Sequence, residues 1–272
     1  MPASAAKTVR HFEIKEQLDK LEVSASIEVI YTPTNARDGM RFRLEGEEEK
    51  LDCIMVQQVG DKLIFKLKPD VNAPSAKDVQ AYISMPPVSS ISVTSAGTVT
   101  VDGDFDSEKS LTLYASVSGS INMNNVYLSD NSCLDVSTSS SGSIDMDDAF
   151  AGTFKSTSSS SGNIDINNLT ADTATIRCSS SGEFETEMKV NALTASSSSN
   201  GNMSLSGIVG NASLTASSNG EIDAEDLTAK RVSISESRRT GGKIIGFGKA
   251  DSDDDDDELN EVKARNVKLE MP

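Results

Sequence analysis

The sequence predicts an all-β protein whose larger part is a β-solenoid, with an N-terminal antiparallel β module. Three observations support this prediction. A glycine returns at a nearly constant interval behind a run of serines. The residues after that glycine alternate between apolar and polar, as in a strand with one buried face. The repeats also lack the 3.6-residue period of a helix, so the predicted elements are short strands joined at corners.

Six glycines define the repeat, and they are Gly119, Gly142, Gly162, Gly182, Gly201 and Gly220. Their period of about 20 residues is typical of stacked structural units, each of which buries its apolar face only against its neighbours. We interpret the six glycines as corners of the coil, because glycine reaches positive φ without steric cost.

Apolar residues recur at fixed distances from these glycines. Two positions after the glycines stand Ile121, Ile144, Ile164, Phe184, Met203 and Ile222. We expect a further apolar column about seven positions after the glycine, at Val126, Ala149, Leu169, Ile208 and Leu227. Lys189 interrupts that column, and Met188 or Val190 is expected to fill the gap.

The serine runs that precede the glycines recur in phase. Inward hydroxyls can bond to their neighbours in the next coil, and the outward serines are expected to form a flat, weakly polar face. The candidate binding face comprises Ser140, Ser160, Ser180, Ser198, Asp145, Asp165 and Asp223. An alternative is that the serines only allow a narrow coil to pack. A disordered low-complexity linker is a third interpretation, which the in-phase apolar columns disfavour.

Residues 8–87 lack the serine–glycine repeat but show strand-like alternation between turn signals. We expect strands within 9–15, 21–31, 40–46, 51–59, 62–68 and 79–85. Such a module would cap the open end of the coil, which otherwise invites edge-to-edge association. Pro86 and Pro87 mark the junction with the solenoid at 88–247.

Residues 248–272 follow the last repeat. They contain the acidic run from Asp251 to Asp257, and calcium binding there is one hypothesis. The run lacks the glycine and the spaced ligands of a defined calcium loop, so a solvated acidic loop is favoured. A final strand is expected within 262–271. No other cofactor or metal is expected.

Charge and cysteine usage exclude several classes of partner. The net charge of −17 argues against nucleic acid and anionic lipid. Cys53, Cys133 and Cys178 have neither zinc-site spacing nor the even count of a disulfide framework, and are expected to be small buried residues.

No segment is long and apolar enough to insert into a membrane. Ala3 to Ala6 resembles the small-residue tail beside a signal cleavage site, which favours an exported protein.

An enzyme is the weakest of the alternatives. Asp145, Asp165 and Asp223 would stack on one face, at a separation that suits acid–base chemistry on a polysaccharide. However, any repeated polar position forms such a column, and the single histidine, His11, lies in the N-terminal module. The sequence contains neither a nucleotide-binding glycine loop nor a Ser-His-Asp set.

A β-rich segment, a Pro-Pro junction and reiterated Gly-x-Ile-Asn/Asp units occur in that order. The units begin at Gly119, Gly142, Gly162 and Gly220. This arrangement resembles the putative auto-transporter adhesin, head GIN domain family, over about Val9 to Phe247. The resemblance implies a right-handed β-helix, export to the surface of Gram-negative bacteria such as the Bacteroidetes, and an adhesive role. It supplies no functional residues.

We therefore expect a non-enzymatic adhesion or binding protein at the outer membrane, the cell surface or in the periplasm. It would present a flat polar face to a glycan or a partner protein. A structural spacer or assembly unit of the cell envelope, which predicts self-association into a homo-oligomer or a fused partner domain, is the first alternative. A polysaccharide-active β-helix enzyme is the second.

Overall fold

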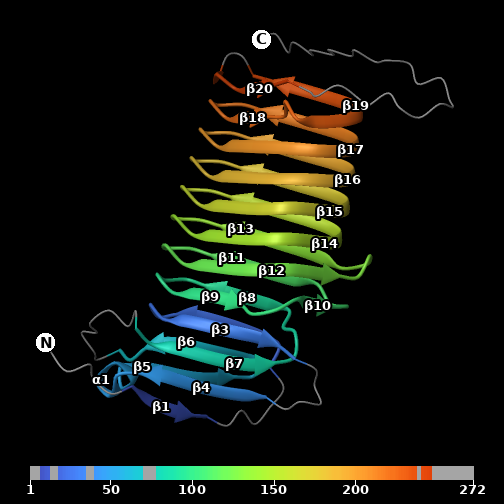
Figure 1. Cartoon of the computed structure of the whole chain (residues 1–272). Helices are drawn as coiled ribbons and strands as arrows, with labels where there is room; N and C mark the ends of the chain where they lie inside the picture. Colours follow the sequence, from blue (N-terminus) through green and yellow to red (C-terminus); the bar gives the residue numbers. More distant parts are fainter. Residues whose placement is uncertain (1–6, 13–17, 35–39, 70–77, 238–239, 247–272) are drawn as a thin grey trace, which may run out of the picture.

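The computed structural model describes residues 7–12, 18–34, 40–69, 78–237 and 240–246. These residues form one sheet of 20 strands, wound into a coil that rises from the N-terminal to the C-terminal end (Figure 1). The only α-helix among them is the single turn α1 (Glu48–Leu51). The all-β prediction is confirmed. The predictions for residues 248–272, including the Asp251 to Asp257 loop, fall outside the described residues.

The N-terminal strands are β1 (Thr8–His11), β2 (Lys20–Ser24), β3 (Glu28–Pro33), β4 (Arg41–Gly46), β5 (Ile54–Val59), β6 (Lys62–Leu67) and β7 (Gln80–Met85). The strands that lead into the repeats are β8 (Ser90–Val93), β9 (Thr98–Val101), β10 (Phe105–Ser107), β11 (Leu111–Ala115), β12 (Ser120–Leu128) and β13 (Cys133–Thr138). The remaining strands are β14 (Ser143–Ser158), β15 (Asn163–Cys178), β16 (Glu183–Ser197), β17 (Asn202–Ala216), β18 (Glu221–Asp223), β19 (Leu227–Glu236) and β20 (Lys243–Ile245).

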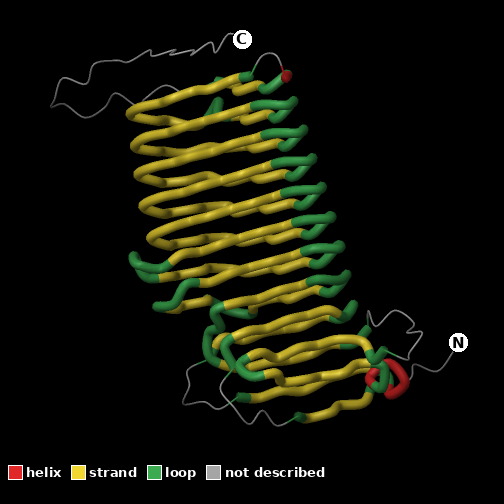
Figure 2. The backbone as a smooth tube through the Cα atoms, turned by 180° about the vertical axis from the view of Figure 1, so that it is seen from behind, coloured by secondary structure: helices red, strands yellow, loops and turns green. Residues whose placement is uncertain are grey.

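The repeats stack as parallel strands in register. β15 pairs with β16 with Asn163 opposite Glu183, and β16 pairs with β17 with Glu183 opposite Asn202. The coil that begins at Glu183 is therefore one residue shorter than the coil that begins at Asn163. The chain is a β-solenoid of about 20 residues per coil, as the sequence predicts. Figure 2 shows that the turns line up along one side of the coil, where they form a continuous edge.

The residues two positions after the repeat glycines form the centre of the core. Ile121, Ile144 and Ile164 have no exposed surface. Burying a side chain of this size stabilises the fold by about 1.5–3 kcal/mol. The apolar column about seven positions after the repeat glycines is confirmed at Val126, Ala149, Leu169 and Leu227. Met188 fills the gap that Lys189 leaves in it.

Ile208 does not join that column and is 62% exposed. The coil that begins at Asn163 carries an extra residue, Asn167. Its register with the coil that begins at Glu183 shifts there, between Ile166 and Asn168. The shorter coils lack this residue, so their inward position comes one residue earlier. Gly207 pairs with Met188 at that position, and Ile208 turns outward.

The turn before each glycine contains two residues at positive φ. In the turn 159–162, Ser160 and Ser161 have φ of 51° and 66°. The Gly162 N–H donates to the carbonyl of Ser159 across 2.9 Å, the geometry of a type I′ turn. The expectation that the repeat glycines supply the positive φ is therefore wrong. Gly162 is required because a Cβ atom there would lie 2.5 Å from Thr138 Oγ1 of the neighbouring coil.

The solenoid begins earlier than the repeat signature indicates. β2 and β3 together form one coil, which lies between the coil of β8 and β9 and the coil of β6 and β7, with parallel pairing on both sides. The segment 21–31, predicted as a single strand, is therefore split into β2 and β3. The sheet is continuous across Pro86 and Pro87.

Antiparallel pairing among the described strands is limited to β1 with β4, β4 with β7, and β5 with β6. The predicted antiparallel module is thus mixed, because its inner strands pair in parallel and extend the solenoid. Leu51, expected at the start of a strand, ends α1 and packs into the core.

Candidate functional site

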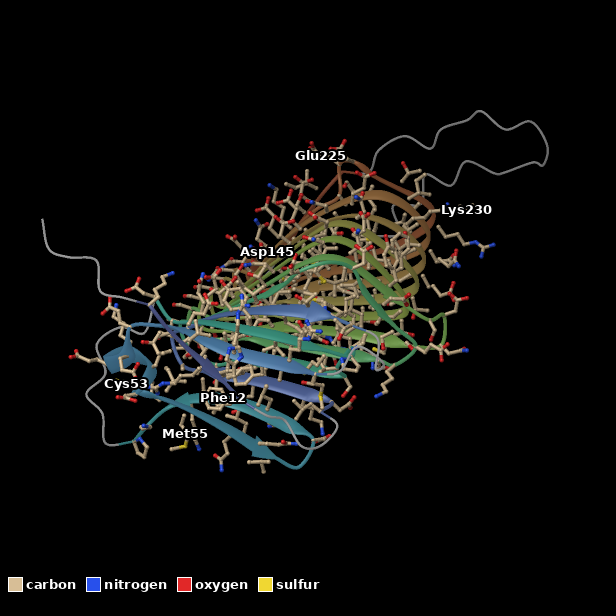
Figure 3. All side chains as sticks on the ribbon, turned by 60° about the horizontal axis from the view of Figure 1, so that its bottom comes forward. Phe12, Cys53, Met55, Asp145, Glu225 and Lys230 are labelled. Atoms are coloured by element: carbon tan, nitrogen blue, oxygen red, sulfur yellow. The ribbon has the colours of Figure 1, made fainter. Side chains whose placement is uncertain are left out.

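One outward position repeats along the sheet that follows the glycines. Strand pairing places Asn122, Asp145, Asp165, Glu185, Ser204 and Asp223 in consecutive coils, and we call them the acidic column. The structure thus makes Asp145 and Asp165 direct neighbours. It places Asp223 in the same column, separated from Asp165 by Glu185 and Ser204. Figure 3 shows Asp145 on the same side of the coil as Glu225, with Lys230 on the other side.

Like charges accumulate in the middle of the acidic column. The pKa of Asp165 is raised above its ordinary value, mainly by partial burial and then by the neighbouring carboxylates of Glu185 and Asp145. Within the described residues, no lysine, arginine or histidine forms an ion pair with Asp145, Asp165 or Glu185. The column is therefore a row of hydrogen-bond acceptors that carries uncompensated negative charge in this part of the structure.

Hydrogen bonds within β12 and β14 orient two members of the column. Ser143 Oγ donates to Asp145 Oδ2 across 2.9 Å, and Ser120 Oγ donates to Asn122 Oδ1 across 3.1 Å. In each pair the serine lies two residues earlier on the same face of its strand, so the contact follows from the pleat. These bonds hold the side chains of Asn122 and Asp145 against their strands.

Two shallow hollows open on this face. The first has a volume of about 250 Å³ and its polar lining includes Asn122, Asn124, Asp145, Asp147, Asp165 and Asn167. The second, of about 320 Å³, has a polar lining that includes Asn200, Asn202, Ser204, Asn219, Glu221 and Asp223. Each hollow contains part of the acidic column, and both are rich in amide and carboxylate groups.

Rungs of asparagine and aspartate join neighbouring coils beside the column. Asn167 Nδ2 donates to Asp147 across 3.0 Å, and Asn168 Nδ2 donates to Asp148 across 2.8 Å. Asn125 bonds in the same way to Asp104. A similar rung, Asn191 to Asp172, lies further along β15 and β16. The serine–glycine repeat does not predict these rungs. An asparagine that follows an aspartate by one repeat length is the signal that would have revealed them.

The candidate serines lie on the turn edge rather than on a flat strand face. Ser140, Ser160 and Ser180 are exposed and have φ of 48°, 51° and 52°, at the tips of successive turns. Ser198 is half-buried one position earlier in its turn, and Ser199 takes its place at the tip. The serines and the aspartates therefore form two adjoining surfaces, an edge and a sheet, and not one plane.

Neither a metal cluster nor a membrane span is evident in the described part of the chain. No group of three or more His, Cys, Asp or Glu side chains there is arranged to hold a metal ion. No described helix is long and apolar enough to cross a bilayer.

The fold and the site together define a β-solenoid with a repetitive outer face rich in carboxylate and amide groups. The chain belongs to the family described as putative auto-transporter adhesin, head GIN domain, whose model matches residues 17–187 and 157–245. The resemblance noted from the Gly-x-Ile-Asn/Asp units is thereby confirmed. The family description is that of an adhesin rather than an enzyme, and it indicates an exported or surface protein.

Solved structures share this architecture. A putative adhesin from Parabacteroides distasonis aligns with a TM-score of 0.69 at 13% identity, over 90% of this chain and 95% of its own. A putative adhesin from Bacteroides fragilis aligns with a TM-score of 0.59 at 16% identity, over 90% and 96%. A putative lipid binding protein from Parabacteroides distasonis aligns with a TM-score of 0.53 at 13% identity, over 88% and 95%. No curated protein matches this chain. At these identities the likeness supports the fold alone.

Proposed function

We propose that this protein is an exported, non-enzymatic adhesion module that binds a glycan through the face formed by the acidic column and its two hollows. The observation behind this proposal is that both hollows lie on one outward column, in coils of the same sheet. A polymer lying along the solenoid axis would meet chemically similar groups at each coil, about 4.8 Å apart.

The chemistry of the face suits hydroxyl-rich ligands. Carboxylate oxygens accept hydrogen bonds, and asparagine amides both donate and accept them. The hollows are shallow and mostly polar, unlike the apolar clefts that enclose small cofactors. The uncompensated negative charge favours neutral or amine-bearing glycans over acidic ones.

The test is affinity gel electrophoresis of the pure protein through neutral and acidic polysaccharides, with and without calcium. We expect neutral polymers to retard the protein, and the double variant D145N/D165N to lose affinity several-fold. The matched control is Asp135→Asn, because Asp135 lies in β13, before the glycine turn, and pairs in register with Lys155 rather than with the acidic column. Binding by D145N/D165N that equals wild type would show that another surface is used. Calcium-dependent retardation would support the hypothesis of a calcium loop at Asp251 to Asp257.

A further inference from the structure

We propose that Tyr127 and Phe150 form a stacking subsite for a pyranose ring of a neutral polysaccharide. This inference rests on the proposed adhesive function, but it concerns a different facet of the coil. The two residues stand at paired positions of β12 and β14. Their ring centroids are 5.1 Å apart at an interplanar angle of 19°, so they stack from one coil to the next.

Tyr127 and Phe150 are two of the four most exposed aromatic residues in the described part of the chain, with Phe12 and Tyr114, and they are the two of these four that stack on each other. Aromatic residues are scarce, with 8 Phe, 4 Tyr and no Trp. Tyr127 and Phe150 are each 37% exposed, whereas Tyr31, Phe65, Phe105 and Phe154 are fully buried. Aromatic rings supply large contact areas at low entropic cost, and they are enriched at binding surfaces for this reason.

The hydroxyl of Tyr127 differs from those of the other tyrosines. Tyr31 donates to the carbonyl of Pro86, Tyr82 donates to Gln80, and Tyr114 bonds to Ser139. Tyr127 alone of the four tyrosines forms no hydrogen bond to a described residue. A stacked ring whose phenolic hydroxyl is available offers an apolar surface and a hydrogen-bonding group at the same point, as a sugar ring requires.

Hydrogen-bonding side chains flank the pair on the same side of each strand. Asn125 precedes Tyr127 by two residues and donates to Asp104, and Asp148 precedes Phe150 by two residues and accepts from Asn168. Because side chains two residues apart share a face, these rungs lie beside the rings. They are fixed by their own bonds, so little conformational entropy is lost when they receive ligand hydroxyls.

The size and charge of the patch decide which ligand it fits. The next residues of the same column are Asp106 on one side, and Thr170 and then Lys189 on the other, so the apolar surface is confined to two rings. A stable protein interface buries about 1,200–2,000 Å² in total, far more than two partly exposed rings provide. Asp104, Asp106 and Asp148 surround the rings and disfavour a polyanion. A neutral pyranose polymer fits both conditions.

The test uses affinity gel electrophoresis through dextran, galactomannan and mixed-linkage glucan, with polygalacturonate as the polyanion. We expect Y127A/F150A to lose at least about tenfold in affinity for a neutral polymer that retards wild type. The matched control is Tyr114→Ala, since Tyr114 is also 37% exposed but lies in β11 and is bonded to Ser139. It should bind as wild type.

A second measurement does not depend on how the double variant folds. The bound polymer should change the tyrosine fluorescence of the wild type, and Tyr127→Phe should remove that change while keeping most of the affinity. Wild-type affinity in Y127A/F150A, or a fluorescence change that persists in Tyr127→Phe, would overturn the subsite. A loss of affinity in D145N/D165N would still support the proposed function in that case.

The remaining outcomes also overturn the subsite. They are retardation by polygalacturonate alone, retardation by none of the polymers, and a partner protein whose binding Y127A/F150A abolishes. The last would assign the aromatic pair to a protein interface.

Discussion

Gly182 lies so close to Ser158 in the neighbouring coil that a Cβ atom at position 182 would be 2.4 Å from the Ser158 carbonyl carbon and oxygen. Gly142, Gly201, Gly220 and Gly242 meet the backbone of the neighbouring coil in the same way. The repeat glycines therefore set the distance between coils at the turn edge. The two residues before each of these glycines, and not the glycine itself, adopt the positive φ of the turn.

Gly182→Ala should destabilise the protein by about 3 kcal/mol, because backbone atoms of a parallel ladder cannot move aside as a flexible side chain can. Gly46→Ala is the matched control. Gly46 has no positive φ, and the nearest atoms to its added Cβ would be side-chain atoms of Val79 and Leu51, at 3.2 and 3.3 Å. Its cost should stay below about 1 kcal/mol. Urea denaturation measures both. Equal losses in the two variants would refute the close-approach explanation.

Replacing each of two buried serines of β14 by alanine should change the free energy of unfolding in opposite directions. Ser158 is fully buried, accepts from Thr138 Oγ1 across 3.0 Å and donates to the Gly162 carbonyl across 2.6 Å. Ser156 is 2% exposed, and its hydroxyl has no hydrogen-bond partner among the described residues. Ser158→Ala should cost about 1–2 kcal/mol, and Ser156→Ala should stabilise by about 1 kcal/mol. Guanidinium midpoints check both, and a shift of the same sign in both variants contradicts the prediction.

Most of the fold could be predicted because each coil repeats the same alternation of buried apolar and exposed polar residues. The alternation after each glycine places Ile144 and Ile164 inward whatever the details of the corners. The coil of β2 and β3 could not be found in this way, since Ala25 to Ile27 has no serine–glycine signature. The glycine that allows the close approach is in the next coil, where a Cβ on Gly97 would lie 2.4 Å from the Ala25 carbonyl oxygen.

The candidate site was predictable only where the repeat is constant. Asp145 and Asp165 lie three residues after their glycines and stack as expected. Ile208 was misplaced because the coil shortens by one residue after Glu183. Ser198 was misplaced because Asn200 occupies the second tip position of its turn, which moves the serine run one place back.

The Tyr127–Phe150 pair could not be predicted in the same way. It occurs once, so no repeat signal marks it. Its exposure depends on which side of the pleat each ring takes in two separate coils, and only the register of β12 with β14 brings the two rings together.

Cysteine labelling should separate the three thiols by burial. Burial raises the pKa of Cys178 to about 12, so at pH 8 almost none of it is the reactive thiolate. Cys53 is buried and donates to the carbonyl of Glu49. Cys133 is partly exposed, and burial raises its pKa more modestly. A thiol reagent at pH 8 should modify Cys133 alone, and slowly, while denatured protein should react at all three positions. Mass spectrometry of digested samples checks this, and modification of folded Cys178 would contradict it.

Asp165 should make stability depend on pH through the acidic column. Its folded-state pKa is raised, mainly by burial and then by Glu185 and Asp145, so the folded protein holds this proton more tightly than the unfolded chain. The stabilising contribution of Asp165 is complete below its unfolded pKa, about 3.9, and is lost as the pH rises through the folded value. At pH 7 the charged side chain therefore opposes folding.

Asp165→Asn should consequently stabilise the protein at pH 7, by only a few tenths of a kcal/mol because solvent screens the column. The gain should shrink toward pH 3.5, and 1 M NaCl should reduce it at pH 7. Asp135→Asn serves as control, since Asp135 pairs in register with Lys155 and its loss should not stabilise. Urea midpoints for wild type and both variants at the two pH values measure these differences. A gain for Asp165→Asn that is equal at both pH values would mean that removal of the Asp165 charge is not its cause.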